Sequence, residues 1–144
     1  MRDFVSNGGR YLGFCLGAYL AGDDPGFGLL PKGDKAVREI KRRGAQVNDT
    51  SDTVIQVDWS FSTGDKQGKT DDGRWLFFQD GAAFKLAKDS PAEVLGRYTK
   101  NGDVAATLNA YGKGWVANIG PHPEADQDWC KTSLRPTNVK SFDS

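Results

Sequence analysis

The chain has 144 residues, with 19 basic and 19 acidic side chains and a formal net charge of zero. This length is typical of one domain, and the balanced charge argues against a surface dedicated to nucleic acid or to an anionic membrane. No run of about 18 apolar residues is present, so the sequence predicts no membrane-spanning helix. We therefore expect neither nucleic acid nor a membrane as a partner.

The first part of the chain predicts short helices that alternate with one strand. Residues 2–7 are typical of the last turn of a helix that two glycines close. A short apolar strand is predicted over 10–14, followed by a turn at Cys15 and a helix over 16–21. A polar helix is predicted from about 35 to 43.

The second part of the chain predicts mostly strands. Apolar and polar residues alternate over 53–59, which indicates a half-buried strand, and the polar, glycine-rich segment 60–73 is expected to be a hairpin loop. The later segments are predicted strands at 75–79, 94–99, 104–110 and 115–119 and a short helix at 125–131. We expect one domain over 1–131 and a polar tail, 132–144, that is poorly ordered.

Cys15 lies in the segment Gly13-Phe14-Cys15-Leu16-Gly17, which has the form G-x-C-x-G. A nucleophile on a sharp strand-to-helix turn rises above the sheet edge at strained backbone angles, and small flanking residues leave room for the turn. The start of a helix favours a thiolate, and the backbone N–H of Leu16 can stabilise an oxyanion. The segment predicts a nucleophilic cysteine; the alternative is a buried structural cysteine in an ordinary turn.

His122, the single histidine, follows the last predicted strand directly. Imidazole titrates near neutral pH and is the usual base for a thiol, and a carboxylate such as Glu124 can orient it. Considered alone, His122 is more simply a solvated loop residue; together with the cysteine turn it predicts a triad of Cys15, His122 and Glu124. Gln79 and Asp80 end a predicted strand and are expected to border the pocket.

Four stretches of the sequence resemble one known family. They are 9–19, around the cysteine turn, 120–127, around the histidine, and the shorter stretches 79–81 and 111–114. They resemble the class I glutamine amidotransferase-like superfamily, and most closely the amino-terminal domain of eukaryotic biotin–protein ligases and its stand-alone fungal relatives. The resemblance implies a flavodoxin-like three-layer α/β fold, with a mixed sheet that has an antiparallel portion in its second half.

The same resemblance implies roles for the three candidate residues. In the superfamily the cysteine attacks an amide, the histidine acts as the base and the glutamate orients it, which assigns these roles to Cys15, His122 and Glu124. The family's first strand, first helix and oxyanion loop precede the nucleophile strand, where this chain is short. We therefore expect an amino-terminally truncated sheet with an exposed edge, and a homodimer that covers it, including one formed by exchanged elements.

Three functional hypotheses stay open at this point. The first is a cysteine-dependent amidase or amidotransferase-like hydrolase that acts on the C–N bond of a small-molecule amide. The second is a catalytically silent amidotransferase-like module for binding or regulation. The third is a secreted structural protein, which only the glycosylation sequon at Asn48 favours; location in the cytoplasm or outside the cell stays open. No nucleotide, flavin or metal motif is present, so we expect no cofactor and no metal.

Overall fold

A computed structural model describes residues 1–60 and 68–125, and within them the chain is mostly β. The helical segments of this part are short: α1 (Arg2–Ser6), α2 (Leu16–Leu20) and the 3-10 turn η1 (Glu39–Lys41). The strands are β1 (Arg10–Phe14), β2 (Lys35–Arg38), β3 (Thr53–Ser60), β4 (Thr70–Phe78), β5 (Ala82–Lys85), β6 (Glu93–Tyr98), β7 (Val104–Tyr111) and β8 (Gly114–Ile119).

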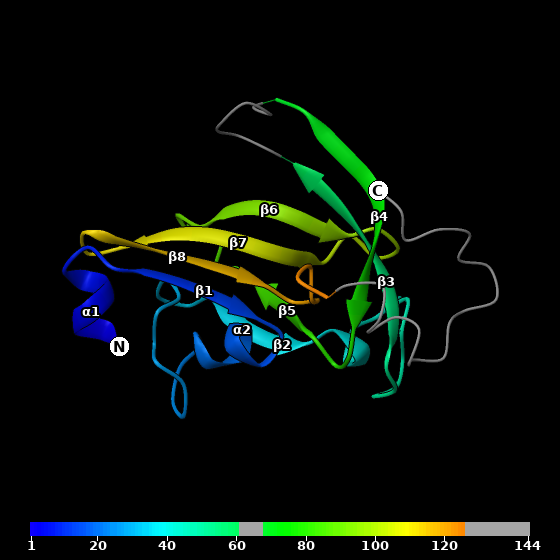
Figure 1. The fold of residues 1–144 in the computed structure, drawn as a ribbon, viewed down its shortest axis with the longest axis horizontal. Helices are drawn as coiled ribbons and strands as arrows, with labels where there is room; N and C mark the ends of the chain where they lie inside the picture. Colours follow the sequence, from blue (N-terminus) through cyan, green and yellow to red (C-terminus); the bar gives the residue numbers. More distant parts are fainter. Residues whose placement is uncertain (61–67, 126–144) are drawn as a thin grey trace.

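All eight strands belong to one mixed sheet. The strand order is β1-β8-β7-β6-β3-β4, and β5 pairs with β7 and with β2 beside this path. Only β1 and β8 run parallel among these pairs; the others are antiparallel. Figure 1 shows β1, β8, β7 and β6 side by side, while β3 and β4 turn steeply away from them, as the twist of a sheet requires.

The curl of the sheet brings its two ends together. β1 and β4 are the first and last strands of the path, yet Phe77 of β4 forms an isolated bridge with His122, just after β8. The N–H of Cys15, just after β1, donates to the carbonyl of Ile119 at the end of β8, at 3.0 Å. The ends of β1, β4 and β8 therefore meet at one place.

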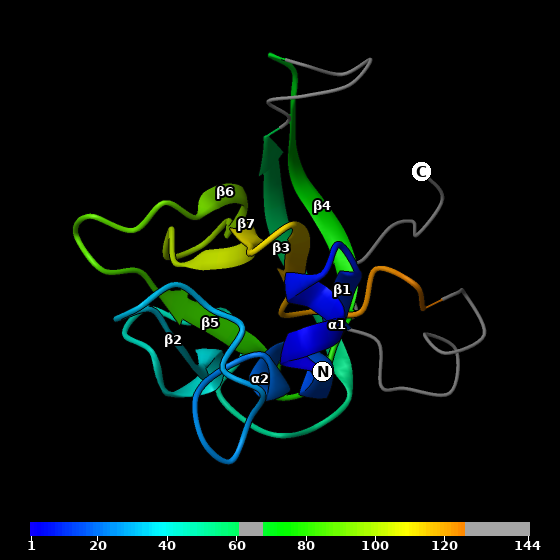
Figure 2. The same cartoon turned by 90° about the vertical axis from the view of Figure 1, so that its left-hand side faces the viewer.

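The helices pack near the β2–β5 pair, which belongs to the same sheet but lies off its main path, and near β8. Val5 of α1 packs against Val116 of β8, and Ala18 of α2 packs in a cluster with Phe84 of β5. Figure 2 shows α2, β2 and β5 grouped below β6 and β7. The main core lies around β3, β4 and β6; its buried members are Ile40, Ile55, Val57, Phe78, Ala83, Tyr98 and Ala105.

The expected fold class is confirmed only in its coarser part. The sheet is mixed, and its second half is antiparallel, as expected. The flavodoxin-like three-layer α/β arrangement is not confirmed, because α1 and α2 have five residues each and form no helical layer over the described sheet. The observed architecture is a curled mixed sheet with few helices.

The prediction of a polar helix over 35–43 is wrong. Lys35–Arg38 is strand β2, and one 3-10 turn follows it. Ala36 and Val37 pair in register with Phe84 and Ala83 of β5, a strand that the sequence analysis missed. Pairing with this distant segment satisfies the backbone and outweighs the local helical pattern.

The other predicted elements are mostly confirmed. The helices predicted at 2–7 and 16–21 are α1 and α2, and the predicted strands match β1, β3, β4, β6, β7 and β8 within a few residues. β4 begins at Thr70, so the connection before it is shorter than the expected loop over 60–73. The tail 132–144 and the helix predicted at 125–131, apart from Ala125, lie outside the described residues.

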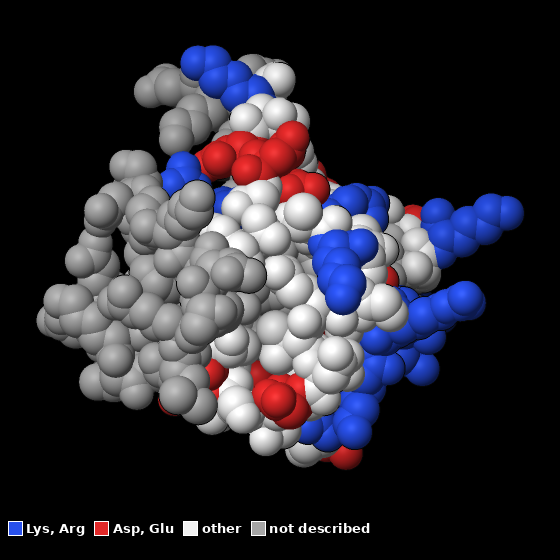
Figure 3. All heavy atoms as spheres, turned by 90° about the vertical axis from the view of Figure 1, so that its right-hand side faces the viewer, with Lys and Arg blue, Asp and Glu red and all other residues white. Residues whose placement is uncertain are grey.

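The surface carries both charge signs. On the face in Figure 3, basic side chains gather along one side and acidic side chains form separate groups, so neither sign covers this face. Over the described parts of the chain, no helix has both the length and the apolar character needed to cross a bilayer.

Candidate active site

Cys15 occupies the sharp turn between β1 and α2. Its backbone angles are φ 47° and ψ −106°, and it is the N-cap residue of α2. A positive φ is uncommon for any residue with a side chain, so this turn is strained. The thiol is partly buried and forms no disulfide. The predicted strand-to-helix turn at Cys15 is therefore present.

The two glycines of the G-x-C-x-G segment have different roles. A Cβ at Gly13 would lie 2.5 Å from the carbonyl oxygen of Gly17 and 2.7 Å from Oδ1 of Asn118, so β1 and α2 pack too closely for a side chain there. A Cβ at Gly17 would meet only the hydroxyl of Tyr11, at 3.8 Å. The expectation that both glycines leave room is right for Gly13 and wrong for Gly17.

His122 is held beside Cys15 by its backbone and its ring. Its N–H donates to the carbonyl of Phe77 at 2.9 Å, and the two rings have centroids 5.7 Å apart. Nδ1 lies 2.6 Å from Oε1 of Glu124. The hydrogen bond with the Cys15 side chain, and after it the one with Glu124, raise the pKa of His122 to about 9 against the opposing effect of burial.

The structure thus brings the three predicted catalytic residues together. Cys15 follows β1, and His122 and Glu124 lie on the loop after β8, where the parallel β1–β8 pair ends. At neutral pH, a pKa of about 9 keeps the imidazole mostly protonated in this arrangement. An imidazolium beside a thiol can stabilise the thiolate, which is the reactive form of a cysteine.

Gln79 and Asp80 border the thiol from the end of β4. The Cys15 thiol donates to the backbone carbonyl of Gln79, at 3.3 Å. Asp80 has a φ of 46°, and its carboxylate accepts two hydrogen bonds from Arg38, at 3.0 and 2.7 Å. The hydroxyl of Tyr19 donates to the carbonyl of Asp80 at 2.9 Å.

Arg38 and Tyr19 were not predicted as members of this site. Tyr19 lies four residues after Cys15, on the same helix, so helical spacing could have placed it near the thiol. Arg38 gave no signal, because it fell in the wrongly predicted helix and its partner Asp80 is 42 residues further along the chain.

A hollow of about 620 Å³ begins at Leu16, the residue after Cys15. It is lined on its apolar side by Leu16, Tyr19, Leu20, Pro25, Ala36 and Val37. Leu16 is 67% exposed, and as the first residue of α2 its N–H has no partner within the helix. A hollow of this size is within the range that small-molecule sites occupy.

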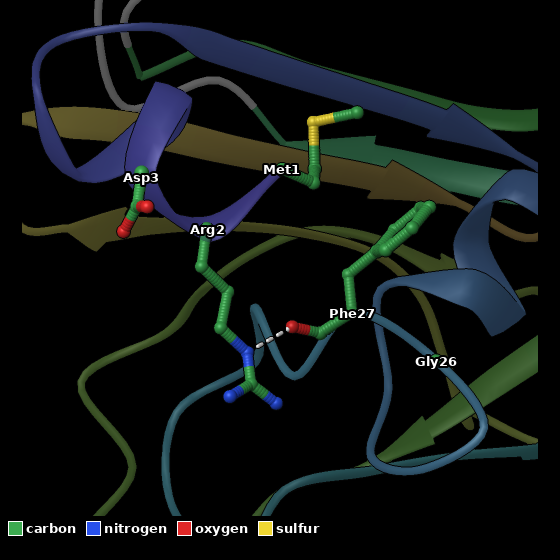
Figure 4. A pocket seen from close by; sticks show the side chains of 5 residues that line it. All are labelled: Met1, Arg2, Asp3, Gly26 and Phe27. Carbon is green, nitrogen blue, oxygen red and sulfur yellow. Dashed lines mark hydrogen bonds between the residues drawn. The ribbon is translucent and has the colours of Figure 1, made fainter.

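A second hollow, of about 380 Å³, lies between α1 and the loop that contains Gly26 and Phe27. Figure 4 shows Arg2 reaching across it, with Nε donating to the carbonyl of Phe27 at 2.6 Å. Cys15, His122 and Glu124 line neither of the two hollows, and only the first begins at the neighbour of Cys15. In residues 1–60 and 68–125, no three His, Cys, Asp or Glu side chains converge in a way that could hold a metal ion.

The comparisons with known proteins give a likeness of fold and no family. No family model matches the chain, and no curated protein does. The β-galactosidase from Rahnella sp. R3 is similar in structure, with a TM-score of 0.51 and 18% identity over 89% of this chain. The β-galactosidase from Bacillus circulans sp. alkalophilus (TM-score 0.49, 16% identity, 91% of this chain) and Gan42B, a GH42 β-galactosidase (0.46, 20%, 94%), are less similar.

The chain spans only a small part of these enzymes: 18% of the Rahnella protein, 20% of the Bacillus protein and 19% of Gan42B. At 18% identity, the likeness to the Rahnella protein concerns the fold alone. The activity in the names of these proteins is therefore not transferred to this chain.

These comparisons correct the predicted family and function. The glutamine amidotransferase-like superfamily and its biotin–protein ligase relatives were expected, but no family model matches, and the Rahnella protein, which is similar in fold, is a β-galactosidase. The amidase or amidotransferase-like hydrolase, and the silent module of the same family, depended on this resemblance and fall with it. The short motifs were too few to identify a family. What remains for the chemistry of Cys15 is the geometry around it.

Proposed function

We propose that this protein captures small activated acyl compounds, such as esters or thioesters, as covalent adducts on Cys15. Two observations support the proposal: the Cys15 side chain is the largest cause of the raised pKa of His122, and Nδ1 of His122 lies 2.6 Å from Oε1 of Glu124. A strained turn that presents the thiol adds to this support. The proposal rests on these contacts and not on a family, and it does not extend to amide cleavage.

In this proposal His122 acts as an imidazolium. Its Nδ1 is directed at the Glu124 carboxylate, the thiol proton passes to solvent, and the positive charge of the ring stabilises the thiolate that remains on Cys15. Glu124 then stabilises the imidazolium and fixes the orientation of the ring. With 20% of the His122 side chain and 36% of the Glu124 side chain exposed, both are open to exchange of the proton with solvent.

The capture step balances without a cofactor. The Cys15 thiolate attacks the carbonyl carbon, a C–S bond forms, and the carbonyl electrons move to the oxygen, where the N–H of Leu16 can stabilise them. The oxyanion then collapses, the bond to the leaving group breaks, and the alkoxide or thiolate takes the proton from His122. A thioester on Cys15 and a free alcohol or thiol are the products.

The geometry favours activated acyl groups over more stable ones. Leu16 supplies one backbone donor, and one donor of this kind is typically worth about 100- to 1000-fold in rate. An ester or thioester has a better leaving group than an amide and needs less stabilisation of the oxyanion. The hollow beside Leu16 would take the remainder of the ligand.

The experiment is acylation by p-nitrophenyl acetate in a Cys130→Ser background, so that Cys15 is the single thiol. We expect a burst of p-nitrophenolate and an acetyl group on Cys15 by mass spectrometry. His122→Ala should slow the burst by about 100-fold or more, and Glu124→Gln, which keeps the shape of the side chain, by less. Cys15→Ser controls for acylation elsewhere.

The pH profile of Cys15 alkylation by iodoacetamide gives a second readout. Wild-type protein should react at lower pH than His122→Ala, because the imidazolium stabilises the thiolate. Equal burst rates and superimposable pH profiles in the two proteins would contradict the proposal. Acetylation of a residue other than Cys15 would contradict it as well.

A further inference from the structure

The turn after β4, residues Gln79 and Asp80, is tied to three other elements. The thiol of Cys15, before α2, donates a hydrogen bond to the carbonyl of Gln79. Tyr19, on α2, donates to the carbonyl of Asp80, and Arg38, at the end of β2, holds the Asp80 carboxylate with two hydrogen bonds. Asp80 keeps a φ of 46°, a conformation that these contacts help to maintain.

The Cys15 thiol therefore has two neighbours with opposite effects. An imidazolium at His122 stabilises a thiolate, which is the reactive form of the cysteine. The carbonyl of Gln79 can only accept a hydrogen bond from the neutral thiol, and its oxygen, with a partial negative charge, disfavours a thiolate at 3.3 Å. Contact with Gln79 therefore disfavours the thiolate that His122 stabilises.

We infer that Tyr19 and Arg38 are positioning residues that hold the Gln79 carbonyl against Cys15 and thereby oppose formation of its thiolate. This inference rests on the proposed function of Cys15 and assigns a control to the same site. Neither side chain has to touch a ligand for this role. Each acts through the backbone of Gln79 and Asp80. The Gln79 carbonyl belongs to that backbone, so no substitution of the Gln79 side chain removes it.

The effect of the Gln79 carbonyl has to be distinguished from that of the titratable and charged groups nearby. Tyr19 on α2, Tyr98 on β6 and His122 after β8 interact with Cys15 electrostatically, while Arg38 pairs with Asp80 and Glu124 with His122. Burial, and after it the charge of Asp80, raise the pKa of Tyr19, so its hydroxyl stays a neutral donor throughout the assay range. Tyr19→Phe therefore removes a hydrogen bond without changing the charge of the site.

In Arg38→Ala, the loss of charge and the release of the Gln79 carbonyl have opposite effects on the rate of alkylation. Loss of a positive charge, with Asp80 left unpaired, would by itself disfavour a thiolate and slow alkylation. Release of the Gln79 carbonyl would speed it. Faster alkylation in Arg38→Ala therefore cannot come from the change in charge, and added salt, which screens the exposed charges, should make the increase larger.

The test measures alkylation of Cys15 by iodoacetamide against pH in the Cys130→Ser background. We expect Tyr19→Phe and Arg38→Ala each to react roughly threefold faster than the parent at pH 6, the effect of one weak hydrogen bond. The midpoint of the profile should move to lower pH. Arg38→Lys, which keeps the charge and one contact with Asp80, should restore the parent profile in part.

Two matched controls come from the same chain. Arg74→Ala breaks another surface pair, with Asp71, in which Nε and Nη2 of Arg74 lie 3.0 and 2.7 Å from Oδ2. Tyr11→Phe removes another tyrosine hydrogen bond to a backbone carbonyl, that of Gly17. Neither involves the 79–80 turn, so both variants should keep the parent profile.

The outcomes separate this inference from the proposed function. If His122→Ala shifts the profile while Tyr19→Phe and Arg38→Ala coincide with the parent or react more slowly, the positioning role is wrong and the proposed function stands. If His122→Ala causes no shift, the proposed function itself is wrong. An equal increase in Arg74→Ala would also overturn the positioning role, because it would show a general loosening of the fold.

Discussion

The pair of His122 and Glu124 predicts that the fold loses stability as the pH rises. The pKa of His122 is raised from 6.5 to about 9, first by Cys15 and then by Glu124. A base with a raised pKa in the folded state contributes stability that is fully present below its unfolded value, here near 6.5. That contribution is lost as the pH rises through about 9. One pKa unit corresponds to about 1.4 kcal/mol, so the contribution is at most about 3 kcal/mol.

Glu39 also makes the free energy of unfolding depend on pH, so its effect has to be removed from this measurement. Burial raises the pKa of Glu39 from 4.5 to about 8, and contact with Asp103 adds to the shift. Its contribution is likewise present at low pH and lost as the pH rises through about 8. The free energy of unfolding of the wild type will therefore fall for two reasons between neutral and alkaline pH. A Glu39→Gln background leaves the His122 contribution alone.

The assay is urea unfolding followed by tryptophan fluorescence, at pH values from 6 to 10, in the Glu39→Gln background. We expect the stability difference between His122 and His122→Gln proteins to shrink by up to about 3 kcal/mol across this range. Cys15→Ser, whose hydroxyl stays neutral, should retain only the share due to Glu124. A difference that stays constant from pH 6 to 10 would refute the assigned contacts of His122.

Two further predictions concern packing and assembly. Gly13→Ala should lower the free energy of unfolding by about 2 to 3 kcal/mol in urea titrations, because the new Cβ meets backbone 2.5 Å away, whereas Gly17→Ala should be neutral or stabilising. The homodimer expected from the sequence stays a prediction: β1 is an end strand whose Leu12 is 61% exposed, and Trp115 of the adjacent β8 is 50% exposed. Wild-type protein should sediment as a dimer at micromolar concentration and Leu12→Lys as a monomer; a monomeric wild type would contradict it.

The parts of the site that could be predicted are those that depend on short segments. The turn at Cys15 follows from two glycines between an apolar strand and a small-residue helix, and the structure has that turn. His122 and Glu124 are two residues apart after a strand, so one loop presents both. Gln79 and Asp80 were expected only as a border, and the backbone of Gln79 contacts the thiol directly.

The parts that could not be predicted depend on contacts between distant segments. Segment 35–43 was predicted as a polar helix, but Ala36 and Val37 pair with β5, almost 50 residues further along the chain. No local pattern shows that the first and last strands of the sheet path meet through the curl of the sheet. The three-layer fold came from the resemblance and not from the residues, since few stretches of this sequence have the length of a layer helix.

The backbone strain at Cys15 gives a test of whether the thiol at this position has a role other than packing. With φ at 47° and ψ at −106°, a residue with a Cβ is strained by about 1 to 3 kcal/mol, whereas glycine accepts these angles. Cys15→Ala loses the thiol and keeps the strain, while Cys15→Gly loses both. After the larger entropy of glycine in the unfolded chain is allowed for, Cys15→Gly should still be more stable than Cys15→Ala by about 1 kcal/mol in urea unfolding. The reverse order would mean that the turn costs nothing, and the backbone angles would then be no argument for a reactive cysteine. The expected order would mean that any residue with a Cβ is strained at this position, which supports a use of the thiol other than packing.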